Sequence, residues 1–204
     1  MGDKIDFRKT LKDLYNPRLR GFQILDIPAM SFLMIDGCGD PNVAVEYQQA
    51  LEGLYALSYG IKFSSKQQGT DFIVPPLEGL WWMDDMSEFT MANRARWKWT
   101  MMIMQPEWIT PGQVERVKDK VITKKKIPTI LDIAFETYLE GMSVQILFTG
   151  AYKDEAPVIA EMHKFIRESG FAPNGKHHEI YLSDPRKTPV EKLNTILRQP
   201  IQKA

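Results

Sequence analysis

The chain has 204 residues and carries 26 basic and 26 acidic side chains, so its formal net charge is zero. This balance argues against broad nucleic-acid binding and against a polybasic membrane anchor, because both need a basic surface. Hydrophobic residues make up 44% and charged residues 25%, which is typical of a folded domain with a substantial core.

Targeting and redox features are sparse. No apolar run reaches the roughly 18 residues of a membrane helix, and the start MGDKIDFRKTLKD lacks the apolar stretch of a secretory signal. We therefore expect a cytoplasmic protein. The single cysteine, Cys38, excludes an intrachain disulfide and a thiolate metal cluster.

Residues 1–22 form a polar leader in which Phe7, Leu11 and Leu14 have helical spacing, which predicts a short amphipathic helix. This N-terminal arm could dock on the domain or act as a lid. It is too short for a helix-turn-helix unit with its own core, so a DNA-binding regulator in one chain is not expected.

The first half combines strands with one long helix. A strand is predicted over 24–37, interrupted at Pro28. Asp40 and Pro41 are then suited to open a helix that Gly60 can end. Three further strands are predicted, over 71–74, 77–83 and 96–104.

The middle of the chain is predicted to be helical. Thr110 and Gln113 form a capping box that begins a basic helix, which runs to the lysines at 124–126 and presents a solvated face. A second amphipathic helix is predicted over 129–140, ended by Gly141.

The last third repeats the order of the first. It contains a predicted strand over 143–150, a helix over 155–168, a strand over 178–182 and a last helix after the capping box at 188–191. This repetition predicts an α+β fold built from two similar modules related by a pseudo-twofold axis. A chance resemblance is the alternative, because a strand, a turn glycine and a helix often follow one another.

All five tryptophans lie between residues 81 and 108, and this cluster is the strongest chemical feature. Trp97 and Trp99 share one face of a strand, whereas Trp81 and Trp82 must point to opposite faces. Such rings can bind planar, apolar or cationic ligands. The alternative is that they are ordinary core.

Glu179 and Tyr181 share one face of the strand over 178–182. They are either solvent-facing or supply a carboxylate and a phenol to a cavity; in a cavity, Glu179 could act as a general base or as a counter-charge for a cation. Tyr152 follows a strand at the start of a helix, where side chains often point into a site.

Other chemistries have little support. His163, His177 and His178 lack metal-ligand spacing, so we expect no metal and no other cofactor. The glycines near Cys38 do not form a phosphate-binding loop, and the thiol has no identifiable basic partner.

Four segments together resemble the GyrI-like small-molecule-binding family, in its stand-alone branch that includes cyclopropanoid hydrolases. They are DGCGDPN (36–42), LYALSY with the following KF (54–63), PLEGLWW (76–82) and EIYLSDP (179–185). The resemblance implies duplicated strand-helix-strand-strand (SHS2-type) modules around a central ligand cleft. It places module one at about 23–105, a helical connection at about 106–141 and module two at about 142–204.

The same resemblance implies that Glu179 is the pocket glutamate and Tyr152 the pocket tyrosine. Ala151 departs from the Gly-Pro-Tyr sequence common in the family at this loop. The predicted ligand-binding side chains are Trp81, Trp82, Trp97, Trp99, Met101 and Tyr181.

The resemblance leaves three hypotheses for function. The first is a detoxifying hydrolase, in which Glu179 activates water against a cyclopropane-bearing aromatic toxin and Tyr152 stabilises the oxyanion. The second is a protein that binds or sequesters planar or cationic drugs without turnover, or that acts on a partner such as gyrase. The third is the sensing partner of a transcription regulator.

Overall fold

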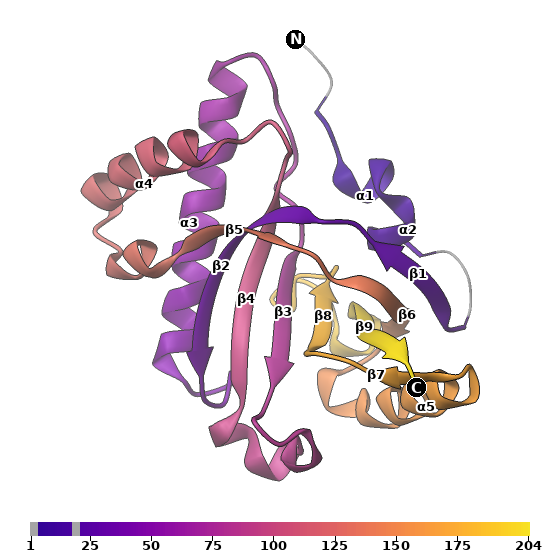
Figure 1. Cartoon of the computed structure of the whole chain (residues 1–204). Coiled ribbons are helices and arrows are strands. Elements are labelled where there is room, and N and C mark those ends of the chain that lie inside the picture. Colours follow the sequence, from indigo (N-terminus) through magenta and orange to yellow (C-terminus); the bar gives the residue numbers. More distant parts are fainter. Residues whose placement is uncertain (1–3, 18–20) are drawn as a thin grey trace.

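A large antiparallel sheet forms the centre of the molecule (Figure 1). The computed structural model describes residues 4–17 and 21–204. The strand order is β1-β6-β9-β8-β3-β4-β2-β5, with β7 pairing with β9. The strands are β1 (Gln23–Ile27), β2 (Met30–Cys38), β3 (Leu77–Trp82), β4 (Lys98–Gln105), β5 (Ala134–Tyr138), β6 (Gly141–Thr149), β7 (Phe171–Pro173), β8 (His177–Tyr181) and β9 (Asn194–Lys203).

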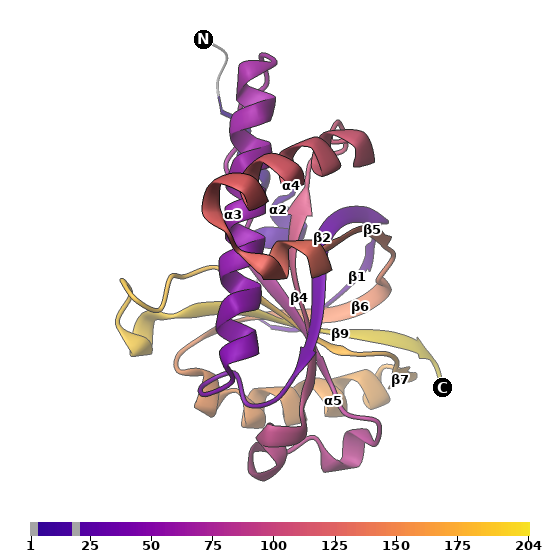
Figure 2. The ribbon, with the colours of Figure 1, turned by 90° about the vertical axis from the view of Figure 1, so that its left-hand side faces the viewer.

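Two helices lie on the same face of this sheet. The register pairs Leu197 with Glu179, Glu179 with Gly79 and Gly79 with Met101, so these positions share one face, which we call the cleft face. Helix α3 (Val45–Gln67) packs on its β2–β4 half, and α5 (Ala156–Glu168) packs on its β6–β9 half. Figure 2 shows α3 upright in front of the strands and α5 lying across the lower part of the molecule.

The two helices bury separate apolar cores. The core under α3 also contacts α4 (Pro111–Lys125), and its buried residues include Leu54, Leu57 and Met101. The core under α5 is built from Val144, Met162, Ile166, Leu197 and Ile201. These two clusters remain distinct, and the space between the helices is where the cleft described below lies.

The rear face carries the alternate positions Glu78, Leu80, His178, Ile180 and Arg198. The N-terminal arm contains two short helices, α1 (Phe7–Thr10) and α2 (Lys12–Tyr15), and α2 contributes Leu14 and Tyr15 to the apolar cluster on this face. Helix α2 therefore does not cover the cleft as a lid. Residues 1–3 and 18–20 of the predicted arm lie outside the described residues.

A buried charge network fastens the arm to the rear face. His178 lies between two carboxylates, with its Nε2 3.0 Å from Glu78 and its Nδ1 2.8 Å from Glu140. Burial alone would lower the pKa of His178, but Glu140 and Glu78 outweigh it and raise the pKa to about 9. Tyr15 donates a 2.7 Å hydrogen bond to Glu78, and Arg198 donates to the carbonyl of Leu14.

The predicted helix over 129–140 is wrong. After α4, Lys126 adopts a left-handed conformation, a 3-10 turn follows at Pro128–Asp132, and β5 then pairs with the edge of β2. The apolar spacing of this segment suits a helix, but pairing with an open sheet edge satisfies its backbone. Only the α4 part of the predicted helical connection over 106–141 is an α-helix.

The last predicted helix is also wrong. Val190–Lys192 form a single 3-10 turn, and the chain then enters β9, whose central residues are buried. The segment 71–74 makes an isolated bridge between Phe72 and Ile5 and is not a strand.

Two boundaries of α3 differ from the prediction. The helix begins at Val45, with Asp40 accepting hydrogen bonds from Asn42 instead of capping it. It also continues through Gly60 to Gln67. Gly60 is needed for close packing, because a Cβ there would lie 2.8 Å from Val117 of α4.

Candidate functional site

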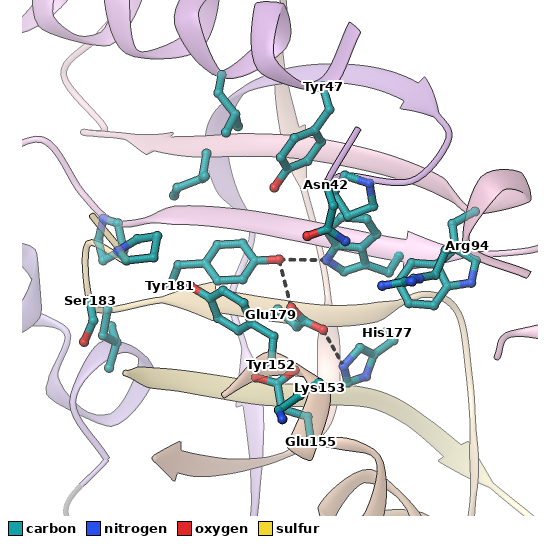
Figure 3. Close-up of a pocket in the computed structure, with 18 of the residues that line it drawn as sticks. Asn42, Tyr47, Arg94, Tyr152, Lys153, Glu155, His177, Glu179, Tyr181 and Ser183 are labelled. Atoms are coloured by element: carbon teal, nitrogen blue, oxygen red, sulfur yellow. Dashed lines mark hydrogen bonds and ion pairs between the residues drawn. The ribbon is translucent and has the colours of Figure 1, made fainter. Parts of the chain in front are cut away.

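A cleft of about 1850 Å³ lies between α3 and α5. Its floor includes side chains from β3 and β8. Two 3-10 helices, η1 (Met86–Glu88) and η2 (Met91–Arg96), and the turn η4 (Tyr152–Asp154) also contribute lining residues. Figure 3 shows Glu179 and Tyr181 of β8, Arg94 of η2 and Tyr152 of η4 around one cavity. Concave sites with aromatic walls and a few polar groups are typical of small-molecule binding.

The aromatic part of the cleft is built around Trp81 and Trp97. Their rings meet edge to face with centroids 5.9 Å apart, and Phe89 stacks on Trp97 at 4.5 Å. Tyr47 of α3 lies 6.1 Å from Trp81. The Trp97 Nε1 donates to the carbonyl of Thr90 at 3.1 Å, which fixes the orientation of this indole. The rings therefore form a pre-arranged aromatic surface in the cleft.

Glu179 lies at the floor of the cleft and is held by a chain of hydrogen bonds. Tyr181 donates to Glu179 Oε2 at 2.8 Å, and Trp81 Nε1 donates to the Tyr181 hydroxyl at 3.0 Å (Figure 3). On its other side, Glu179 Oε1 lies 3.5 Å from His177 Nε2. This arrangement fixes the carboxylate and leaves 16% of its side chain exposed.

Tyr152 brings a hydroxyl to the same region from the turn before α5. Its ring meets that of Tyr181 edge to face at 5.7 Å, and Tyr152 is 39% exposed. Burial, Glu155 and Glu179 raise the pKa of Tyr152 to about 12. The phenol is therefore protonated at neutral pH and available as a hydrogen-bond donor.

Glu155 is a lining residue that the sequence reasoning missed. It precedes α5 and is only 4% exposed. Burial and the neighbouring Glu179 raise the pKa of Glu155 to about 9, so its carboxyl is uncharged at neutral pH. The spacing of Tyr152 and Glu155 at the start of a helix could have suggested that the two lie on one side.

Five of the eight predicted site residues line the cleft, namely Tyr152, Glu179, Tyr181, Trp81 and Trp97. The other three do not. Trp82 points to the rear face, where Lys176 Nζ lies 3.4 Å from its ring centroid. Trp99 and Met101 share the cleft face but are fully buried beneath it.

The burial of Trp99 has a local cause. Tyr47 covers its ring at 5.3 Å, and the same ring packs where a Cβ of Gly37 would stand. Trp97 precedes β4 and lines the cleft. The fifth tryptophan, Trp108, packs against Phe7 and Phe72 in the core. The tryptophan-rich segment is thus divided between the cleft, the core and the rear face.

The described ranges, 4–17 and 21–204, contain no group of three or more His, Cys, Asp or Glu residues placed to hold a metal ion. Nor do they contain a helix long and apolar enough to cross a membrane.

Known structures resemble the whole chain closely. An uncharacterized conserved protein from Listeria innocua is 40% identical, with a TM-score of 0.91, covering 98% of this chain and 100% of its own. A protein from the same organism, described as a hydrolase, is 39% identical with a TM-score of 0.89 and the same coverage. The C-terminal domain of EcmrR shares the fold at 10% identity, with a TM-score of 0.56, covering 91% of this chain and 99% of its own.

The family comparison agrees with these structures. No protein with a curated description matches the chain significantly. The profile of the GyrI-like small molecule binding domain, however, matches residues 21–202, which include both helices and every strand around the cleft. The chain belongs to the GyrI-like small-molecule-binding family.

Proposed function

We propose that the protein binds planar aromatic molecules in the cleft and hydrolyses cytotoxins that carry a strained cyclopropane on a dienone ring. The observation that carries this proposal is the position of Glu179, a fixed carboxylate beside the rings of Trp81 and Tyr181 and near the protonated phenol of Tyr152. Such a site combines a flat binding surface, a base and an oxyanion donor.

The reaction adds one water across a carbon–carbon bond. Glu179 accepts a proton from water while the water oxygen bonds to the cyclopropane methylene carbon. The ring bond breaks, and its electron pair passes into the dienone, whose carbonyl oxygen becomes a phenolate. The proton held by Glu179 then returns, through solvent, to the phenolate. Release of ring strain and gain of aromaticity drive the reaction, so no cofactor is required.

Tyr152 has the complementary role. Because its pKa of about 12 keeps it protonated, its hydroxyl can donate to the carbonyl oxygen as negative charge develops there. A positioned base and an oxyanion donor each contribute about 10²-fold or more to a rate. The Listeria protein described as a hydrolase is 39% identical over nearly the whole chain, which supports a hydrolytic reaction in this cleft.

The test is Glu179→Gln, which keeps the shape of the side chain and removes the base. We expect the rate of ring opening of a cyclopropane-bearing dienone to fall at least about 10²-fold, measured by the mass of the product. Ligand affinity, measured by quenching of tryptophan fluorescence, should change little. The matched control is Glu161→Gln on the exposed side of α5. Unchanged turnover in Glu179→Gln would exclude the mechanism.

The size of the cleft favours a second candidate function. Its volume of about 1850 Å³ exceeds the roughly 300–1,000 Å³ of an ordinary ligand pocket. A protein that sequesters planar or cationic drugs of different sizes would need such space, with Glu179 as a counter-charge. Tryptophan quenching by an aromatic ligand that is recovered unaltered would favour binding without turnover.

We also propose that the two halves of the chain are copies of one strand-helix-strand-strand module. The order β2-α3-β3-β4 in the first half corresponds to β6-α5-β8-β9 in the second. Within the sheet the halves run β6-β9-β8 and β3-β4-β2, which mirror each other about the β8–β3 pairing. This arrangement supports a cleft formed between the two copies.

A further inference from the structure

One end of the cleft differs in chemistry from the aromatic part. Five polar lining residues, which we call the polar lobe, gather beside β8, β9 and α5: Glu155, His163, Asn174, His177 and Gln199. His177 is 2% exposed and Glu155 is 4% exposed. Figure 3 shows His177 and Glu155 on the side of Glu179 away from Tyr47.

Several buried atoms of this lobe are unsatisfied. Glu155 Oε1, His163 Nε2 and both ring nitrogens of His177 have no hydrogen-bond partner among residues 4–17 and 21–204. The 3.5 Å separation of His177 and Glu179 is within ion-pair range but does not form a hydrogen bond. Unpaired buried donors and acceptors cost free energy, so these atoms are suited to receive polar groups from a ligand.

The lobe also has space for such a group. The cleft-facing positions of α5 are Ala156, Ile159, Ala160 and His163, which follow helical spacing. The two alanines leave room below the helix, and Gly175 adds no side chain on the opposite side.

The charge state of the lobe selects the kind of group. Burial and His177 lower the pKa of His163, so its ring is neutral at pH 7. The Glu155 carboxyl is protonated there, since its pKa is about 9. The neighbouring charges are Glu179 on the floor, Lys153 at the cleft and Arg167 on α5. Glu155 and His163 therefore offer hydrogen-bonding atoms without carrying a charge.

We propose that the polar lobe binds an uncharged hydrogen-bonding tail, of the primary amide class, on a ligand whose aromatic ring lies against Trp81 and Trp97. This inference rests on the aromatic binding part of the proposed function and not on hydrolysis. His177 and Trp81 are directly paired on neighbouring strands and both line the cleft, so their backbone positions lie about one strand spacing apart, roughly 4.8 Å. A three-carbon tether spans that distance.

The test uses four probes that share a naphthalene ring and differ in the tail: naphthylbutanamide, butylnaphthalene, naphthylbutanoate and naphthylbutylammonium. Calorimetry at pH 7 should show the amide binding about tenfold tighter than the alkyl probe, as expected for one or two buried hydrogen bonds. The same preference should disappear in His177→Phe. His163→Leu, at a half-buried position of α5, should weaken the preference for the amide. It serves as a second variant if His177→Phe does not fold.

Trp97→Leu is the matched control and should weaken all four probes by a similar factor while leaving the amide preference intact. Equal binding of the four probes, tightest binding of the carboxylate or the ammonium, or an amide preference that survives both histidine variants would overturn the polar-lobe proposal. Binding of none of the probes would overturn aromatic binding as well. Unchanged turnover in Glu179→Gln bears only on hydrolysis.

Discussion

The Tyr181 hydroxyl donates a 2.8 Å hydrogen bond to Glu179 Oε2, so the group that orients the carboxylate is two residues away on the same strand. Tyr181→Phe removes this bond and leaves Trp81 Nε1 without its acceptor. If Glu179 is the base, we expect kcat for ring opening to fall about tenfold, because the carboxylate loses its fixed orientation.

The control for this variant is Tyr138→Phe, at the sheet edge on the rear face. Steady-state kinetics should show its kcat unchanged. An effect of Tyr181→Phe on KM alone would mean that Tyr181 contributes to ligand binding and not to positioning of the base.

Glu155 predicts a pH dependence of stability. Its pKa is about 9 in the folded protein and about 4.3 in an unfolded chain, so the folded state binds the extra proton between these values. Stability must therefore decrease as pH rises through this window. Glu155→Gln removes this pH dependence. The free energy of unfolding of the variant, relative to that of the parent, should therefore rise by about 1–3 kcal/mol between pH 5 and pH 9.

Urea unfolding at pH 5, 7 and 9 measures this difference. The titration of His178 occurs in both proteins and cancels in the comparison. A constant difference between parent and variant across the three pH values would contradict the raised pKa of Glu155.

Tyr15 tests the attachment of the N-terminal arm. Its buried hydroxyl donates to Glu78 at 2.7 Å, and Tyr15→Phe leaves that carboxylate oxygen without this donor. We expect a loss of about 1.5–3 kcal/mol in the free energy of unfolding, as for hydrogen bonds to charged groups. Tyr59→Phe, at an exposed position of α3, should change it by less than about 0.5 kcal/mol.

Gly79 tests the packing of the cleft floor. A Cβ at this position would lie 2.8 Å from Trp81 Nε1 and 3.2 Å from the sulfur of Met101, so Gly79→Ala should displace the indole from Tyr181. We expect affinity for an aromatic probe to fall about tenfold by calorimetry. Gly112→Ala is the control, because its nearest neighbour would be 3.5 Å away. Equal affinities of the two variants would contradict this account.

Much of the fold follows from local sequence. The capping box of Thr110 and Gln113 begins α4 as predicted, and the spacing over 155–168 predicts α5. The helix predicted over 129–140 was wrong because the apolar spacing of this segment is helical, whereas the open edge of β2 supplies hydrogen bonds that only a strand can use. Long-range pairing therefore overrides local pattern at the sheet edges.

The site was predictable where it depends on strand alternation. Glu179 and Tyr181 share a face, and the register places that face in the cleft. The separation of Trp97 from Trp99 was not predictable, because it depends on where Tyr47 of α3 lies. Glu155 was not predicted as a site residue for a similar reason, since its burial arises when α5 packs over the second half of the sheet.

The β3–β8 pairing joins the two halves of the sheet beneath the cleft. A ligand that pushes α3 and α5 apart must therefore bend the sheet about this seam, where Gly79 faces Glu179. Glu78 precedes Gly79 on β3, and His178 precedes Glu179 on β8. Both belong to the hydrogen-bond network that holds Tyr15. Widening of the cleft would therefore displace the residues that bind the N-terminal arm on the opposite side of the sheet.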